Sequence, residues 1–309
     1  MQDCLPFELR RHWDDPAVTD VLVNDETEVW IERRGRLERC PDLRPGEIDL
    51  TLQRLLTPLG RRLDRLAPMV DARLPDGTRV CAVIEPVAVG GTCAAFRIFR
   101  REPFALDDFA PDDEPEVWAS IAERIRGSTA NLLITGATGS GKSALLGALA
   151  SMSSPSERII VIEDTYELVI DHPNVVRLES RNPTHEGRGA INIDDLLRTA
   201  LRLRPDRLIV GEVRGREALT LVQAMSTGHR RCLATLHANS ALDGLRRLDV
   251  LTLSAAAGWS IEDARSLVNS AVGLVVHMER AIDGSRVIDH VATVDSTTNE
   301  RHAGTGSCP

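Results

Sequence analysis

The sequence predicts an α/β protein of two domains, and three observations support this fold class. The chain has 309 residues, a length that suits two domains of ordinary size. Its first hundred residues hold short β-rich runs around one helical pattern, which is typical of a small α+β domain. From residue 116 onward, apolar strand-like runs alternate with helical patterns, which favours a mostly parallel sheet with helices on both faces.

The first domain, residues 1–103, is predicted to combine several strands with one helix. Leucines recur at helical spacing within residues 48–61. A Pro-Asp-Gly turn at residues 75–77 separates two of the β-rich runs. The predicted strands are Val18–Asn24, Glu28–Arg33, Met69–Leu74, Arg79–Ile84 and Cys93–Phe99.

The segment REPFALDDFAPDDEP, residues 101–115, combines prolines with an acidic run. This composition predicts a linker over residues 104–115, and the alternative is a solvated loop inside one domain. A polar stretch of small residues at 296–309 predicts a disordered tail.

The second domain, residues 116–295, is where strands and helices alternate. Gly228 follows one helical pattern as a C-terminal cap would, and Ser260-Ile-Glu-Asp263 fits a capping box. Asp283-Gly284 predicts a hairpin turn between 275–279 and 286–294. The other predicted strands are Leu132–Thr135, Arg158–Glu163, Arg207–Val213 and Cys232–Ala238, and the other predicted helices are Glu116–Arg126, Ala144–Met152, Asn192–Arg204 and Arg216–Thr227.

The segment GATGSGKS, residues 136–143, fits the phosphate-binding pattern G-x-x-x-x-G-K-[ST] between a predicted strand and a predicted helix. Lys142 is the only lysine among the 37 Lys+Arg residues, so 36 are arginine. A slim ammonium fits a phosphate cradle that a planar guanidinium would not, which explains this one lysine. Ser143 would offer its hydroxyl to Mg²⁺. The expected contacts to the nucleotide come from Gly136, Ala137, Thr138, Gly139, Ser140, Gly141, Lys142 and Ser143.

Acidic residues follow two of the β-rich runs, at the positions where metal and water ligands lie in open α/β sheets. Glu163, in VIEDTYEL, is predicted to be the base or orienter for the attacking water. Glu212, in RLIVGEVRG, is predicted to hold Mg²⁺ through its shell of waters. Glu167 could equally start a helix or lie on the surface.

His229 and His237 stand at opposite ends of one strand-like run. A histidine there could sense the γ-phosphate, although a structural role is the alternative for each. No third nitrogen or sulfur ligand lies at a zinc spacing from this pair.

Composition limits the compartment and the partners. The formal net charge is −9, so the chain lacks the overall positive charge that is typical of a nucleic-acid-binding protein. No signal peptide and no run of 18 apolar residues is visible, so we expect a cytoplasmic protein without a transmembrane segment. We expect the six cysteines to be reduced thiols, with a Cys81–Cys93 disulfide as the alternative.

Four ordered motifs, GATGSGKS, VIEDTYEL, LRLRPDRLIVGEVRG and STGHRRCLATLHANS, resemble those of the secretion ATPases of type II and type IV systems. The stretches VTDVLVNDETEVWIERRGRLE and DARLPDGTRV look like the Tad/CpaF branch, which powers Flp-type pilus assembly. The resemblance covers residues 15–295. It implies an N-terminal domain followed by a RecA-like motor domain, with ATP bound as the magnesium complex.

The resemblance also implies a cytoplasmic ring hexamer, peripheral at the inner face of the cell membrane and docked on an inner-membrane platform protein. The family's arginines that reach the nucleotide match Arg73, Arg79 and Arg97, with Arg100 a weaker match. Such arginines would stabilise charge on the transferring phosphoryl group. With 36 arginines in the chain, a surface role is the alternative for each.

The sequence departs from the family pattern in one motif, where Arg230-Arg231-Cys232 stand in place of the usual glycine. The helical N-terminal extension common in the branch and the tetracysteine zinc element of some relatives are not visible in this sequence. Besides an ATP-hydrolysing motor, two functions therefore remain open: a nucleotide-gated scaffold with little turnover, and a conjugal-transfer ATPase.

Overall fold

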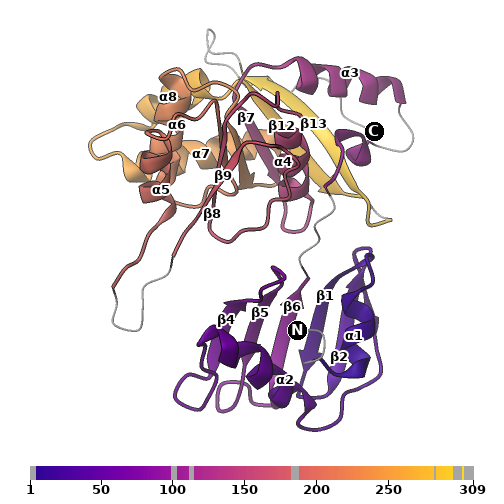
Figure 1. Cartoon of the computed structure of the whole chain (residues 1–309). Coiled ribbons are helices and arrows are strands. Elements are labelled where there is room, and N and C mark those ends of the chain that lie inside the picture. The colour runs from indigo at the N-terminus through magenta and orange to yellow at the C-terminus, as the bar shows by residue number, and fades with distance from the viewer. Residues whose placement is uncertain are drawn as a thin grey trace. The chain divides into compact units, whose positions relative to one another are not determined.

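The computed structural model describes residues 5–98, 103–110, 115–181, 188–281, 283–294 and 301–302. The chain divides into two compact units, Met1–Arg101 and Glu102–Pro309, and each has its own hydrophobic core (Figure 1). In the described ranges, no helix combines the length and the apolar character needed to cross a bilayer.

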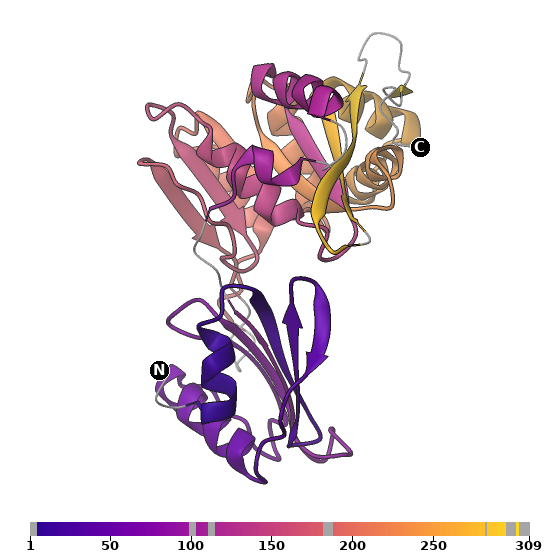
Figure 2. The same cartoon turned by 90° about the vertical axis from the view of Figure 1, so that its right-hand side faces the viewer.

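The first unit is a six-stranded antiparallel sheet with helices on one face (Figure 2). Its strands follow the order β3-β2-β1-β6-β5-β4. Apolar residues alternate along the strands, so that one face is buried against the helices and the other face is partly exposed. The elements are α1 (Phe7–Trp13), β1 (Val18–Asn24), β2 (Glu28–Arg33), β3 (Arg36–Arg39), α2 (Glu47–Leu56), η2 (Thr57–Leu59), β4 (Met69–Arg73), β5 (Arg79–Val83) and β6 (Cys93–Arg97).

The second unit contains an eight-stranded sheet in the order β14-β13-β12-β7-β11-β10-β8-β9. The strands from β12 to β9 pair in parallel, and β13 and β14 are antiparallel additions at one edge. The elements are η3 (Leu106–Phe109), α3 (Pro115–Gly127), β7 (Leu132–Gly136), α4 (Lys142–Ser151), β8 (Ile159–Glu163), β9 (Val175–Glu179), α5 (Ile193–Ala200), β10 (Arg207–Val210), α6 (Glu217–Ser226), β11 (Leu233–His237), α7 (Ala241–Ala255), α8 (Ile261–Ala271), β12 (Leu274–Arg280), β13 (Arg286–Val294) and β14 (Arg301–His302).

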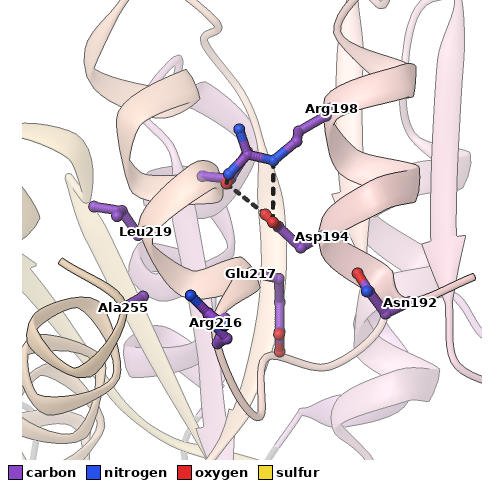
Figure 3. Close-up of a pocket in the computed structure, with 8 residues that line it drawn as sticks. Asn192, Asp194, Arg198, Arg216, Glu217, Leu219 and Ala255 are labelled. Carbon is purple, nitrogen blue, oxygen red and sulfur yellow. Dashed lines mark hydrogen bonds and ion pairs between the residues drawn. The ribbon is translucent and has the colours of Figure 1, made fainter. Parts of the chain in front are cut away.

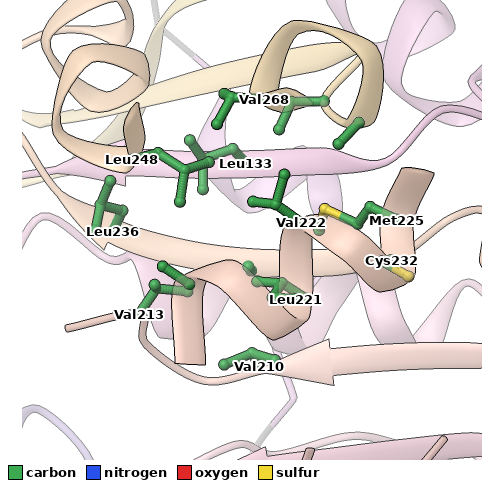
Figure 4. Packing of buried hydrophobic residues seen from close by; sticks show 14 of the residues in the cluster. Leu133, Val210, Val213, Leu221, Val222, Met225, Cys232, Leu236, Leu248 and Val268 are labelled. Carbon is green, nitrogen blue, oxygen red and sulfur yellow. The ribbon is translucent and has the colours of Figure 1, made fainter. Parts of the chain in front are cut away.

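Helices cover both faces of this sheet, as the alternating pattern predicts. Residues of α5, α6, α7 and α8 pack on one face in a cluster of Leu, Ile, Val, Ala, Met and Cys side chains (Figure 4). Residues of α3, α4 and η3 pack on the other face. Strands buried on both faces consist of continuous apolar runs, and all five residues of β7 and of β8 are buried.

Several local predictions can be compared directly with this structure. Leu106 and Phe109, in the predicted linker, are buried in the core of the second unit because η3 packs beside α4. Within the predicted tail, 301–302 pair with β13, and 295–300 and 303–309 lie outside the described residues.

The capping and cysteine predictions are also decided by the structure. Gly228 has φ +112° just past α6, and Ser260 accepts a hydrogen bond from the Asp263 N–H at the start of α8. Cys81 and Cys93 are free thiols, so the disulfide alternative is wrong. Cys4 and Cys308 lie outside the described residues.

Candidate functional site

The segment between β7 and α4 is a tight loop that glycine alone can form. Gly136, Gly139 and Gly141 all have positive φ angles, of 148°, 77° and 98°. A Cβ on Gly136 would lie 2.4 Å from the Met278 carbonyl oxygen and 2.6 Å from Ser140 Oγ. The loop therefore follows a path that brings its backbone against β12 and turns directly into the first residue of α4.

Lys142 is the first residue of α4, and its side chain folds back over the loop. Its Nζ donates to the carbonyl oxygens of Gly136 at 2.9 Å and Ala137 at 2.7 Å, and it lies 3.2 Å from His237 Nδ1. The residue is 6% exposed, and burial lowers the pKa of the ammonium to about 8. These acceptors carry no net charge, so the buried ammonium keeps a positive charge that attracts an anion, although the acceptors already engage its protons.

The same loop presents further groups to a phosphate and a metal ion. The N-terminus of α4 directs its free N–H groups and its positive dipole end at this loop. Ser140 Oγ is buried and, within the described residues, makes no hydrogen bond. Ser143 is exposed in the first turn of α4, where its hydroxyl oxygen can serve as a hard ligand for Mg²⁺.

Glu163 is the last residue of β8, and its carboxylate is buried with 4% exposure. Its Oε1 accepts hydrogen bonds from the N–H groups of Glu167 and Leu168, both at 2.8 Å. Burial raises the pKa of Glu163 to about 7, although these two hydrogen bonds act in the opposite direction. A carboxyl group with this pKa can exchange a proton near neutral pH, as a general base must.

Glu212 lies two residues after the end of β10 and makes two polar contacts, one with a guanidinium and one with an imidazole. Its Oε2 accepts from Arg214 at 2.6 Å, and its Oε1 lies 3.1 Å from His237 Nε2. Burial alone would raise the pKa of Glu212, but Arg214, His237 and Lys142 together lower it. The carboxylate is therefore ionised at neutral pH, as a metal-side acid should be.

These contacts form one chain of polar groups, Lys142–His237–Glu212–Arg214. The carboxyl ends of β7, β11 and β10 lie side by side in the sheet, which brings the four residues together. Burial, then Lys142, lowers the pKa of His237, so the ring is neutral. Its Nδ1 accepts from Lys142 and its Nε2–H donates to Glu212, a tautomer that follows from the two partners.

Glu163 lies beside this chain of polar groups. A Cβ on Gly211, the residue before Glu212, would lie 3.0 Å from Glu163 Cγ. Glycine at this position lets β8 and β10 bring the two carboxylates to neighbouring places at the same edge of the sheet. Glu167 contributes its backbone N–H to Glu163, which the sequence pattern left undecided.

The structure does not bring His229 to this site. His229 precedes β11, whereas His237 is the last residue of β11 and lies beside Gly136. The two histidines therefore lie at opposite ends of this strand. His229 Nδ1 is buried and, among the described residues, has no hydrogen-bond partner. In the departure that follows it, Arg231 has φ +58° and its guanidinium pairs with Glu157 at 3.0 Å.

The three candidate arginines lie in the first unit and form one row. Arg73 is paired with Arg79, and Arg79 with Arg97, across β4, β5 and β6. Directly paired residues share a face of the sheet, and this face is the one turned away from the core of the unit. Arg97 also donates to Asp20 at 3.0 Å, and Arg100 lies outside the described residues.

Two functional candidates were not found from the sequence. Arg214 binds Glu212 and lies 3.6 Å from Asp164, so it joins the two acidic segments. Buried Glu217 accepts from the N–H groups of Arg214 and Gly215 at 2.6 and 2.7 Å, which fixes the loop that carries Arg214. An arginine and a glutamate near Glu212 were visible in the sequence, but nothing in the pattern separated them from surface residues.

A cavity of 450 Å³ lies between α5 and α6, near the start of α6 (Figure 3). An Asp194–Arg198 ion pair of 3.0 Å lies along α5, and Thr220 of α6 hydrogen-bonds to both residues. Its lining contains none of Lys142, Glu163 and Glu212, so this cavity is separate from the phosphate loop. It is lined by Asn192, Asp194, Arg198, Arg216, Glu217, Leu219, Thr220 and Ala255.

A phosphate loop leads directly into a helix, and two acids, ionised Glu212 and buried Glu163, lie at the ends of neighbouring parallel strands. Together these features define an α/β ATPase of the P-loop class. The chain belongs to the family of type II/IV secretion system proteins, whose model matches residues 8–309. Among known proteins it is similar to a putative conjugal transfer protein, Rv3659c, of Mycobacterium tuberculosis, with 36% identity over 288 residues, 90% of this chain and 81% of the relative. It is also 33% identical over 295 residues to the conjugal transfer protein TrbB of Rhizobium radiobacter, which covers 93% of this chain and 87% of the relative.

Solved structures show the same fold. The VirB11 ATPase of the Brucella suis type IV secretion system matches 93% of this chain and 92% of its own, with 26% identity and a TM-score of 0.51. The pilus retraction motor PilT with bound ADP matches 96% of this chain and 84% of its own, with 22% identity and a TM-score of 0.68. The prediction of an α/β ATPase motor fold is therefore confirmed.

Proposed function

We propose that this chain is a magnesium-dependent, ATP-hydrolysing motor that powers Tad/Flp-type pilus assembly or type II/IV secretion. The observation that carries the proposal is the juxtaposition of buried Glu163 with the Lys142–His237–Glu212 chain at one edge of the sheet. Its partner would be an inner-membrane platform protein, its assembly a homo-hexamer, and its location the cytoplasmic face of the membrane. The likeness to the VirB11 ATPase of a type IV secretion system supports the class of process.

In this proposal each residue acts on the triphosphate. Lys142 leaves the carbonyl oxygens of its own loop for the phosphate oxygens, and the N–H groups at the start of α4 hold the anion. Ser143 and Glu212 would hold Mg²⁺, which would neutralise charge on the phosphates. Glu163 would orient the attacking water and take its proton.

Two further groups would act around this centre. When Lys142 moves to the phosphate, His237 would lose one of its two partners and change its contact with Glu212, because its ring joins the two side chains. The row of Arg73, Arg79 and Arg97 would stabilise charge on the transferring phosphoryl group.

The experiment is steady-state phosphate release by the assembled protein with MgATP. We expect turnover in the wild type and its loss in Lys142→Ala and in Glu163→Gln, with nucleotide binding lost only in Lys142→Ala. A wild type that binds nucleotide without releasing phosphate would instead support the gated scaffold, for which the Arg230-Arg231 departure is the motivating feature. Turnover that survives both substitutions contradicts the proposal.

A conjugal-transfer motor is the second candidate, because the Mycobacterium and Rhizobium relatives are named for conjugal transfer. The net charge of −9 disfavours direct contact with DNA. DNA binding that weakens steeply with salt would support this candidate over pilus assembly. Unchanged surface filaments after deletion of the gene in its host would do the same.

A further inference from the structure

A cluster of metal-ligand side chains lies on the β12–β13 hairpin, apart from the residues assigned to the nucleotide. Ligand atoms of His277, Glu279 and Asp289 all lie within 4.8 Å of one another. His277 Nε2 is 3.7 Å from Glu279 Oε1. The two strands run side by side at one end of the sheet of the second unit (Figure 1).

An irregularity in the strand pairing brings these residues together. The register shifts between His277 and Met278, so that two residues of β13, Asp289 and His290, stand opposite the single residue His277. Met278 and Ile288 face the core on the other side of the sheet, which leaves His277, Glu279 and Asp289 on a common face. A regular ladder would have turned Asp289 away from His277.

The surroundings of His277 can accommodate the form that a metal ion requires. His277 is 4% exposed, and its Nδ1 lies 2.9 Å from Thr135 Oγ1. In the tautomer with its proton on Nδ1, the ring donates to the Thr135 hydroxyl, which can donate in turn to the Val276 carbonyl oxygen 3.4 Å away. Nε2 then carries the lone pair and points to the Glu279 side of the ring. A ligating histidine whose other nitrogen donates to a protein oxygen is the usual arrangement in metal sites.

The charge and the spacing suit a small divalent ion. One imidazole and two carboxylates bring two negative charges, which a divalent cation neutralises. Zn²⁺ bonds of about 2.0–2.2 Å place tetrahedral ligand atoms roughly 3.4 Å apart, so ligand atoms that lie within 4.8 Å of one another must close by up to about 1.4 Å. Glu279 is 57% exposed in its side chain and can change rotamer to do so. The neighbouring ring of His290 has a buried Nε2 that makes no hydrogen bond within the described residues.

We propose that His277, Glu279 and Asp289 form a binding site for Zn²⁺ or a similar transition-metal cation, with water in the fourth position. The ion would fasten β12 to β13 beside the phosphate loop, because Thr135 precedes Gly136 and the Arg286 side chain packs against Gly141. The site is independent of the nucleotide chemistry, and its success or failure leaves the proposed ATPase untouched.

The test is a titration of the full-length protein with Co²⁺ in the absence of nucleotide, followed by displacement with Zn²⁺. We expect one equivalent of Co²⁺ with visible d–d bands and no thiolate charge-transfer band, since the three ligands are nitrogen and oxygen. Asp289→Asn and Glu279→Gln should each weaken this equivalent by about tenfold or more. His277→Gln should abolish it.

Asp283→Asn is the matched control, because it removes one charge from the same hairpin but its carboxylate bonds to Ser285 instead. It should leave Co²⁺ affinity unchanged. The two carboxylate variants keep the experiment decisive should the buried His277 variant fail to fold. Equal Co²⁺ affinity and stoichiometry in wild type, Asp289→Asn and Glu279→Gln would overturn the proposal, as would a spectrum that shows thiolate ligation alone.

Discussion

At the scale of single residues, Glu163 combines burial with a raised pKa, and this links its chemistry to folding stability. Between its ordinary pKa of 4.5 and about 7, the folded chain holds a proton that the unfolded chain has released. The free energy of unfolding therefore falls as pH rises through this window, because ionisation is penalised only in the folded state.

The first prediction concerns Glu163→Gln at pH 8. Glutamine keeps an oxygen acceptor for the N–H groups of Glu167 and Leu168 but has no charge to bury. We expect the free energy of unfolding to rise by roughly 1–3 kcal/mol while turnover is lost. Urea unfolding and phosphate release on the same sample measure both, and a loss of stability at pH 8 would contradict this account.

A second prediction is the pH profile of the wild-type enzyme. A general base must be ionised, so kcat/KM should increase with pH through an apparent pKa near 7. Glu167→Gln serves as the comparison, because Glu167 contacts Glu163 through its backbone N–H. This variant should keep the same rise with pH, with a slightly lower apparent pKa, because the Glu167 carboxylate also raises the pKa of Glu163. A profile that stays flat between pH 6 and 8 would exclude Glu163 as the base.

The third prediction compares two glycines of the phosphate loop. In Gly136→Ala the new methyl group would meet the Met278 backbone oxygen at 2.4 Å, so we expect a loss of several kcal/mol of stability, on the order of 2–4. In Gly139→Ala nothing lies within 4 Å, and the cost is limited to the positive φ, about 1 kcal/mol. Thermal denaturation distinguishes them, and equal losses would contradict the close approach of the loop to β12.

Much of the site was predictable because its residues follow apolar runs that form parallel strands. A residue at the end of such a run lies at the carboxyl end of a strand, where all these ends meet on one side of the sheet. Lys142, Glu163, Glu212 and His237 come together as expected for this reason. His229 does not, because a run of strand residues separates it from the edge that carries His237. Arg214 and His277 were not singled out, since their roles depend on partners from other strands.

At the scale of elements, helix α8 shows how a local signal becomes a measurable contribution. Ser260 Oγ accepts from the Asp263 N–H, and the Asp263 carboxylate accepts from the Ser260 N–H in return. Because the two side chains accept from backbone N–H groups that have no partner within the helix, the capping box stabilises the first turn of α8.

The fourth prediction is that Ser260→Ala lowers the free energy of unfolding by about 1 kcal/mol. Ser270→Ala on the same helix is the control, because its hydroxyl bonds only to the Leu267 carbonyl oxygen within the helix. Urea denaturation of both variants measures the difference. Equal effects of the two substitutions would show that the capping box contributes nothing.

Elements with a strong local signal were predicted, and those defined by packing were not. The strands β7, β8, β10 and β11 consist mostly of apolar residues, and the structure confirms them. The edge strands β3 and β9 were not predicted, because their residues are polar or only partly buried. Helix α7 was also not predicted, although Ser240 caps it and leucines recur along it.

At the scale of the whole molecule, the two units have separate cores. The core of the first unit is drawn from residues 5–98, and both clusters of the second come from residues beyond 103. Each unit therefore has a buried apolar core of its own, as a folding domain does.

The fifth prediction is that fragments 1–101 and 102–309 each unfold cooperatively. We expect the 102–309 fragment to bind nucleotide, although it lacks the arginine row of the first unit, because Lys142 and Ser143 lie within it. Calorimetry and fluorescent-nucleotide binding test this. A fragment without a cooperative transition would show that its core needs the other unit.

The resting position of Lys142 also sets a threshold for the entry of substrate. The ammonium is already satisfied by two carbonyl oxygens and an imidazole of its own fold, so these groups compete with every incoming anion for the same three protons. The fraction of protein with bound nucleotide thus depends on these internal hydrogen bonds as well as on the nucleotide concentration. Removing the His237 acceptor would allow the nucleotide to bind at lower concentrations.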